Sequence, residues 1–235
     1  MRRYRAFMLL ALPILLLVAF GSDVANSGHE GLIIRAALAA NPVGSCTSAG
    51  TDNQVYSLTG YKFPSTSMTF KTNQSTFPTY ISKSEVQSAI KSAFTTWDGA
   101  TRRALFVDGG TTTAKANTKD GVNTVAFGNL GGGYVAAAYG WFNTSNVVIE
   151  FDITLSTSYT WATNVTKNGD CGGAANAFDV RNITTHEVGH PVGLNDLYGT
   201  SDKAQTMYGY AAYQELYKRT LANGDKKGVL FLFGQ

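Results

Sequence analysis

The sequence is poor in several residue types whose scarcity limits what the protein can be. Its 235 residues include two cysteines, three histidines and five prolines, and 15% of the side chains are charged. No internal repeat and no long low-complexity linker divides the chain, which indicates one compact domain with processing segments at its start. Hydrophobic residues make up 44% of the chain, enough for a core, so we expect a folded rather than a wholly disordered chain.

An excess of charge of one sign is also missing once the N-terminus is set aside. The formal net charge is +3, but Arg2, Arg3 and Arg5 lie within residues 1–21, which hold no acidic residue. Without that segment, 16 basic side chains face 16 acidic ones. A neutral protein offers no electrostatic reason to bind nucleic acid, so we expect no nucleic-acid partner.

The N-terminal segment has the pattern of an export signal. A basic start precedes the apolar run 6–20, which is interrupted by Pro13 and is short for a membrane-spanning helix. Small residues allow cleavage before Ser22, and the sequence Ala-Leu-Ala at 37–39 offers a second, later site. We expect an extracellular protein with no stable membrane association, and a retained N-terminal anchor is the alternative. The expected segments are a signal peptide at 1–21, a short pro-segment or linker at 22–54 and the main domain at 55–235.

Two cysteines, Cys46 and Cys171, suit an exported protein with a single disulfide. That bond would close a long loop and tie the N-terminal segment to the region just before a histidine pair at 186 and 190. The alternative is that Cys46 blocks a metal ion in a latent form of the protein.

Three helices are expected from local signals. A capping box at 82–85 starts a helix whose apolar residues recur at 3- and 4-residue steps and which should end at Gly99. Asp179 can cap a second helix that runs through His190. A last helix is expected at 223–233.

Strands are expected between the first two helices, at 123–127, 134–142 and 147–155. One helix, then strands, then two helices is an α+β order. In the third strand, apolar residues alternate with polar ones as in a half-buried strand: Ile149, Phe151, Ile153 and Leu155 against Glu150, Asp152 and Thr154.

Two of the three histidines, His186 and His190, flank Glu187. On a helix, positions i and i+4 lie about 40° apart, so both imidazoles project from one face and can chelate one ion. Glu187 is turned by about a further 100°, which suits a base acting on metal-bound water. Zinc favours such nitrogen ligands and keeps a fourth position for water when three protein ligands bind it. The alternative is a surface helix that carries these residues by chance.

The residues after His190 offer a third ligand. Gly193 can take the left-handed conformation that turns the chain back towards the metal. Asp196 then offers a carboxylate oxygen, and no histidine comes after it in the sequence. Asp196 is therefore the candidate third ligand, with Asp202 as the spare.

The run 186–196 resembles the long zinc signature of the metzincins. It has Asp where most members have a third histidine, as in snapalysin-like and some bacterial matrixin-like enzymes. The segment 206–209 resembles the methionine turn that lies beneath the metal in that clan. The expected helices and strands come in matrixin-like order, so the resemblance covers about residues 55–235.

This resemblance implies a metzincin-like catalytic domain. Its fold would be a twisted, mostly parallel sheet with an antiparallel edge strand, packed on helices, with the zinc cleft below that strand. It implies a secreted zinc endopeptidase with Glu187 as general base and with Gly193 and Met207 supporting the site. Tyr208 or Tyr210 would contact the oxyanion or the substrate, or simply pack beside the metal turn.

Protein or peptide substrates are the implied partners, and we expect a monomer. An extended substrate could pair with the strand 134–142, which could instead be a plain core strand. Animal matrixins carry a second, structural zinc bound by further histidines. The one remaining histidine, His29, lies in the segment expected to be removed, so we expect one catalytic zinc.

Calcium could bind near the glycine-rich loop 128–133, or at Glu150, Asp152 and Asp170, but no pattern assigns a site. Pro191 is a second departure, because proline removes the N–H that would bond to a carbonyl of the preceding turn and can kink the helix. The rival functions are a catalytically inactive zinc-binding module with a binding role and a zinc hydrolase that is not a peptidase.

Overall fold

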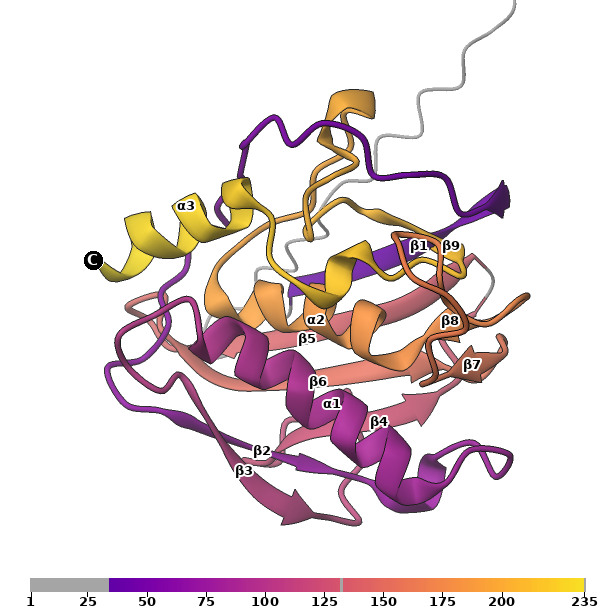
Figure 1. The fold of residues 1–235 in the computed structure, drawn as a ribbon. Helices are drawn as coiled ribbons and strands as arrows, with labels where there is room; N and C mark the ends of the chain where they lie inside the picture. The colour runs from indigo at the N-terminus through magenta and orange to yellow at the C-terminus, as the bar shows by residue number, and fades with distance from the viewer. Residues whose placement is uncertain (1–33, 132, 235) are drawn as a thin grey trace, which may run out of the picture.

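The computed structural model describes residues 34–131 and 133–234, and the backbone alone for 34–45. The expected signal peptide and the first part of the 22–54 segment lie outside the described residues. Helices α1 and α2 cover one face of a large sheet, and α3 lies towards one end of the molecule (Figure 1). The helices are α1 (Lys83–Asp98), α2 (Val180–Val192) and α3 (Asn223–Phe233), with short 3-10 turns at Gln74–Thr76, Thr200–Asp202 and Tyr217–Arg219.

Seven strands form the large sheet, in the order β3-β2-β4-β6-β5-β1-β9. A second, two-stranded sheet pairs β7 with β8. The strands are β1 (Ile34–Ser45), β2 (Met68–Thr72), β3 (Phe106–Thr111), β4 (Asn123–Gly128), β5 (Tyr134–Phe142), β6 (Val148–Ser156), β7 (Trp161–Ala162), β8 (Phe178–Asp179) and β9 (Tyr210–Tyr213).

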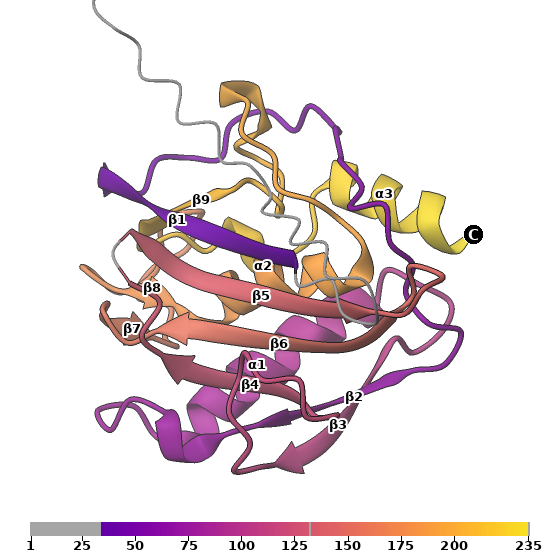
Figure 2. The same cartoon turned by 180° about the vertical axis from the view of Figure 1, so that it is seen from behind.

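Strand directions confirm the expected fold class. Strands β3, β2, β4 and β6 run parallel, and β5 runs antiparallel to β6. The two strands beyond β5 were not expected from the sequence. Strand β1 pairs with β5 along its outer edge, and β9 pairs with β1 (Figure 2). The antiparallel strand therefore has a partner on each side, and the second partner comes from the segment expected to be a pro-segment or linker.

Helix α1 begins and ends where its sequence predicts. Ser82 Oγ accepts the Glu85 N–H, the Glu85 carboxylate accepts the Ser82 N–H, and Gly99 is the C-cap. This reciprocal cap gives hydrogen-bond acceptors to two backbone N–H groups that would otherwise have no partner at the start of the helix. Trp97 donates its indole N–H to the Thr185 carbonyl oxygen of α2 at 2.7 Å. The apolar face is buried in the core: Val86, Ala89, Ile90, Ala93, Phe94 and Trp97.

Strand β6 is not half-buried, so that expectation is wrong. Glu150 and Asp152 are buried because the loop before β4 folds over their face and donates backbone N–H groups to both carboxylates. Ile149 is 45% exposed, although the alternation placed it inwards. The pairing between β5 and β6 shifts register at this point, so Ile149 has no partner and sits in a bulge.

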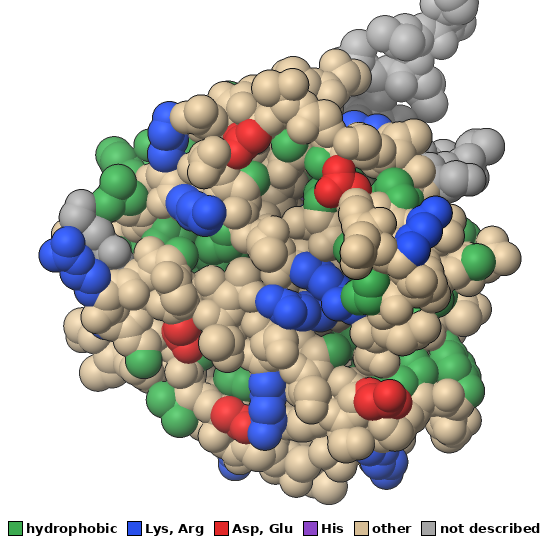
Figure 3. Space-filling view, in the orientation of Figure 1, with side chains coloured by type: hydrophobic (Ala, Val, Ile, Leu, Met, Phe, Trp, Pro, Cys, Tyr) green, Lys and Arg blue, Asp and Glu red, His purple; other side chains and the backbone are tan. Residues whose placement is uncertain are grey.

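Basic and acidic side chains are interspersed over the face seen in Figure 3, with one small basic group near its centre. The largest basic contribution to the formal charge, in residues 2–5, lies outside the described residues. No helix within 34–131 and 133–234 has the length and hydropathy needed to cross a membrane.

Candidate metal centre

Helix α2 carries the histidine motif through the interior of the protein. Asp179 caps its start by accepting the Asn182 N–H at 2.8 Å, and Arg219 forms an ion pair with the same carboxylate. Almost every side chain from Val180 to Val192 is buried, so the helix has no solvent face. The alternative of a surface helix that carries these residues by chance is therefore excluded.

Each histidine ring is held by its Nδ1 atom. His186 Nδ1 lies 2.7 Å from the Thr206 carbonyl oxygen, and His190 Nδ1 lies 3.0 Å from that of Leu194. A carbonyl can only accept, so Nδ1 carries the proton in both rings and each Nε2 presents a lone pair. Both Nε2 atoms are buried without a hydrogen-bond partner. Buried polar atoms of this kind call for a ligand, and a metal ion fits two converging imidazole lone pairs.

Gly193 turns the chain back as its position predicts. It is the C-cap of α2 with φ of 119°, and its N–H reaches the carbonyl oxygens of Gly189 and His190. A side chain at this φ would be strained, which is why glycine suits the position. The turn brings Asp196 to the histidines, with its Oδ1 3.0 Å from His186 Nε2 and 3.7 Å from His190 Nε2.

These three side chains fit a zinc ion. Their ligand atoms all lie within 4.8 Å of one another. Ligands about 2.0–2.1 Å from a tetrahedral zinc lie roughly 3.4 Å apart, close to the two distances observed. Burial lowers the pKa of His190 to about 4, which keeps its ring neutral. Burial acts to raise the pKa of Asp196, but the two histidines and Tyr198 outweigh it and hold that pKa below its usual value, so the carboxylate stays ionised.

Glu187 lies between the two histidines on α2 and is fully buried. It is not one of the three clustered side chains. This is the position expected for a base beside the metal rather than for a ligand.

Met207 packs directly under the histidine helix. A Cβ added to Gly189 would overlap Met207 Sδ and lie 2.7 Å from Trp97 Cζ2, so Met207 and Gly189 are in close contact. Asp225, at the start of α3, holds the methionine turn by accepting the Thr206 N–H at 2.8 Å and the Met207 N–H at 3.2 Å. The role of Asp225 could not be predicted from the sequence, because nothing in the local pattern links α3 to this turn.

Three tyrosines form a group of neighbouring rings that contacts Asp196. Tyr198 donates its hydroxyl to Asp196 Oδ2 at 3.1 Å, a role that the sequence did not suggest. The Tyr198 ring lies 5.6 Å from that of Tyr210, which lies 5.5 Å from that of Tyr208. Tyr208 and Tyr210 therefore belong to an aromatic group that reaches a candidate ligand through Tyr198.

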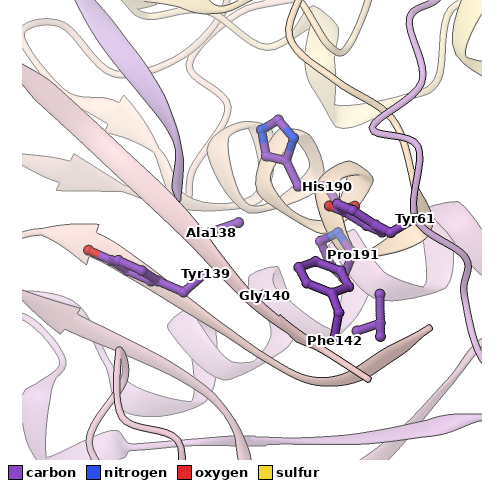
Figure 4. A pocket seen from close by; sticks show the side chains of 8 residues that line it. Tyr61, Ala138, Tyr139, Gly140, Phe142, His190 and Pro191 are labelled. Carbon is purple, nitrogen blue, oxygen red and sulfur yellow. The ribbon is translucent and has the colours of Figure 1, made fainter. Parts of the chain in front are cut away.

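Pro191 does not pull the ligands apart. Helix α2 continues through it to Val192. Tyr61 donates its hydroxyl to the His190 carbonyl oxygen at 2.6 Å and packs its ring 4.2 Å from that of Phe142. Figure 4 shows these side chains together beside His190. Tyr61 thus fixes the last turn of α2 at the residue before the proline, a contact that no pattern in the sequence indicates.

The other candidate acids are engaged elsewhere. Asp202 accepts hydrogen bonds from Asn53 and Gly199, so the spare ligand is used in loop structure. Glu150 and Asp152 accept backbone N–H groups of the loop over β6, and Asp170 accepts hydrogen bonds from Ser48 and Ala49. Among the described residues, the cluster of His186, His190 and Asp196 is the one group suited to a metal ion.

Cys46 and Cys171 form a disulfide across 125 residues of sequence, with their Cα atoms 5.4 Å apart. The predicted pairing is confirmed. Because Cys46 is bonded to Cys171, its sulfur is not a metal ligand here, which removes the alternative in which Cys46 blocks the metal.

Comparison with known proteins agrees with this geometry. No curated protein sequence matches the chain significantly. The family model described as matrixin matches residues 62–234, which include the three residues of the metal cluster and all three helices. The chain therefore belongs to the matrixin family and carries a zinc metallopeptidase domain.

Proposed function

We propose that the protein is a secreted zinc endopeptidase that cleaves peptide bonds of extracellular proteins. His186, His190 and Asp196 hold the zinc, and Glu187 is the general base. The observation that carries the proposal is the convergence of two bare Nε2 atoms and one carboxylate oxygen within 4.8 Å, with Glu187 buried on the same helix.

The residues divide the chemistry between them. A bound zinc ion supplies a Lewis acid that polarises the peptide carbonyl and acidifies a water molecule. Glu187 accepts a proton from the attacking water and passes it to the amine that leaves. Thr206 and Leu194 keep the histidine rings in the tautomer that binds metal, through their carbonyl oxygens. Burial of Glu187 excludes bulk water from the proton that it holds.

The alternative of a catalytically inactive zinc-binding module rests on the expectation that Pro191 kinks the helix and moves the metal ligands. The ligand atoms converge in spite of the proline, which favours the active enzyme. A zinc hydrolase that is not a peptidase would instead prefer esters or small amides to peptides. Turnover of matched ester, amide and peptide substrates separates the two.

The proposal is tested with Glu187→Gln. The variant should keep its zinc, because Glu187 is not a ligand, yet lose nearly all hydrolysis of a generic protein such as casein, because an amide cannot take the proton. Glu85→Gln is the matched control, since Glu85 is an exposed residue of the α1 capping box and is not part of the metal cluster, and it should leave hydrolysis unchanged. Loss of zinc in Glu187→Gln, or full activity without Glu187, would refute the assigned role.

The proposed segments carry a separate test. Export with removal of residues 1–21 should place the N-terminus of the freshly secreted chain at Ser22, which N-terminal sequencing measures. Chains that keep Met1 and remain attached to the membrane would contradict export in soluble form and favour the retained anchor. A single species of about one chain's mass in light scattering would support the monomer.

A further inference from the structure

A second cleft, separate from the metal cluster, lies where α1 meets the start of α2. It is lined by α1, by the first turn of α2, by the 3-10 turn Tyr217–Arg219 and by the loop after β7. Its volume of about 360 Å³ falls in the range of about 300–1,000 Å³ that holds small-molecule ligands. All its lining side chains except Ala89 are polar or charged, and none belongs to the metal cluster. Such a lining suits a charged ligand rather than an apolar one.

Two arginines, Arg181 and Arg219, are the cations that line this cleft. The Thr96 hydroxyl lies between their chains, 3.4 Å from Arg181 Nη2 and 3.5 Å from the Arg219 carbonyl oxygen. Burial and the Arg219 guanidinium lower the pKa of Arg181, and Asp179 offsets this only in part. The two guanidinium groups are therefore close enough to repel each other, and a bound anion would relieve that repulsion.

The two arginines differ in their partners. Arg219 donates Nε to Asp179 Oδ1 at 2.8 Å, and its Nη2 donates to the same carboxylate and to the Thr163 carbonyl oxygen. Among the ion pairs of the described residues, none includes Arg181. Its Nε is buried without a hydrogen-bond partner, and its Nη2 makes the long contact with Thr96. A cation that lacks both a counter-ion and acceptors calls for a ligand that supplies them.

Neutral donors line other parts of the cleft. Ser84 and Ser88 lie about one turn apart on α1, and their side chains are exposed, as is that of Asn164. Oxyanions accept hydrogen bonds from hydroxyl, amide and guanidinium groups alike, and the planar guanidinium matches two of their oxygens at once.

We propose that this cleft binds one sulfate or phosphate group, free or as an ester, with Arg181 as its main contact. Figure 3 shows a small basic group near the centre of the face on which α1 and α2 lie. The proposed site goes beyond the endopeptidase function, because it needs neither the zinc ion nor Glu187.

The Glu85 carboxylate also lines the cleft and gives the proposal a test of sign. It accepts the Ser82 N–H at 3.3 Å and the Ser82 hydroxyl at 2.7 Å, which hold it at the N-terminal cap of α1. Its charge opposes the binding of an anion and favours that of a cation. Removing the Glu85 charge should therefore tighten anion binding, whereas removing the Arg181 charge should weaken it.

The experiment titrates the full exported, zinc-loaded chain and records backbone amide shifts by NMR. Inorganic sulfate and inorganic phosphate are the probes, and sodium chloride keeps the ionic strength constant so that screening does not change. We expect saturable shifts in α1, at Asn164 and in the first turn of α2. Glucose 6-sulfate presents the group as an ester: tighter binding than inorganic sulfate would indicate an ester as the ligand, and weaker binding the free ion.

Arg181→Gln should weaken sulfate binding at least about tenfold, because it removes charge-assisted hydrogen bonds. Arg181→Lys should fall between, since it keeps the charge but loses the planar fork. Arg102→Gln is the matched control: Arg102 is exposed, the change in charge is the same, and it does not line the cleft. It should change the affinity by less than about twofold, because exposed charges at a distance are screened. Glu85→Gln should tighten binding about two- to fivefold.

Shifts that rise linearly with sulfate, without saturation, would overturn the proposal, because they indicate a general salt effect. Equal weakening by Arg181→Gln and Arg102→Gln would also overturn it, since the overall charge would then account for binding. If Arg181→Gln does not fold, Ser88→Asp tests the same cleft from an exposed position and should abolish binding, whereas Ser88→Asn should keep it. Unchanged binding in Ser88→Asp would contradict the site. Glu187→Gln should bind sulfate as wild type does, so failure of the endopeptidase function and failure of this site are distinguishable.

Discussion

Gly189→Ala is a one-methyl test of how the methionine turn supports the metal. The added Cβ would overlap Met207 Sδ and lie 3.0 Å from Met207 Cε and 2.7 Å from Trp97 Cζ2. Both neighbours are buried, so neither side chain has open space to move into. Trp97 is fully buried and bonded to the Thr185 carbonyl oxygen, and the Met207 backbone N–H is bonded to Asp225. The strain must therefore be taken up by a shift of α2 against the methionine turn.

Overpacking of this kind costs about 1–3 kcal/mol. For a domain of this size, each kcal/mol lowers the melting temperature by about 2–4 °C, so we expect a fall of roughly 2–12 °C. Because His186 Nδ1 bonds to Thr206, next to Met207, a shift between α2 and the turn should also weaken zinc binding. Thermal unfolding and a chelator competition measure the two effects.

A double-mutant cycle identifies the cause. Met207→Ala removes the clashing atoms, so Gly189→Ala should cost less in that background, with a coupling of about 0.5–3 kcal/mol. Helix propensity alone would make Gly189→Ala stabilising by up to about 1 kcal/mol. A Gly189→Ala variant that is more stable than wild type and holds zinc equally well would refute the packing argument.

Three further changes probe the surroundings of the site. Lys218→Met leaves the buried carboxylate of Glu215 without its ion-pair partner, so the free energy of unfolding in urea should fall by about 3–5 kcal/mol. The double variant Lys218→Met/Glu215→Leu removes both charges and should recover most of that stability. Equal stability of the two variants would contradict this. Burial raises the pKa of Asp152 from 3.8 to about 7, so its contribution to stability is full below pH 4 and is lost as the pH rises to 7. The difference in unfolding free energy between wild type and Asp152→Asn should therefore fall by about 4 kcal/mol from pH 4 to pH 8, at 1.36 kcal/mol per pKa unit, and a constant difference would contradict the assignment. Tyr198→Phe removes the hydrogen bond to Asp196 and should weaken zinc binding about 10–100-fold in a chelator competition, while unchanged affinity would show that the hydroxyl is dispensable.

The parts of the site that the sequence predicted are those set by local geometry. The i, i+4 spacing of His186 and His190 fixes one helix face, and the glycine at 193 has the left-handed φ that its position called for. The capping residues Ser82 and Asp179 also act where expected, because a cap depends on the next three residues alone. Such local signals hold in the folded protein because each depends on only a few neighbouring residues.

The parts that the sequence missed depend on pairing between distant segments. Residues 34–45 hold no alternation that would mark a strand, and β1 exists because β5 and β9 offer it two edges. Asp225 reaches the methionine turn from the start of another helix, and Tyr61 reaches His190 across 129 residues of sequence. The exposure of Ile149 results from a bulge that only the register of two strands reveals.

Zinc stoichiometry of two aspartate variants measures the ligand set directly. Wild type, Asp196→Ala and Asp202→Ala are loaded with zinc, passed through gel filtration and analysed for metal. We expect one zinc per chain in wild type and in Asp202→Ala, whose carboxylate serves Asn53 and Gly199, and clear loss in Asp196→Ala. One tightly held zinc in Asp196→Ala, or its loss in Asp202→Ala, would contradict a centre built from His186, His190 and Asp196.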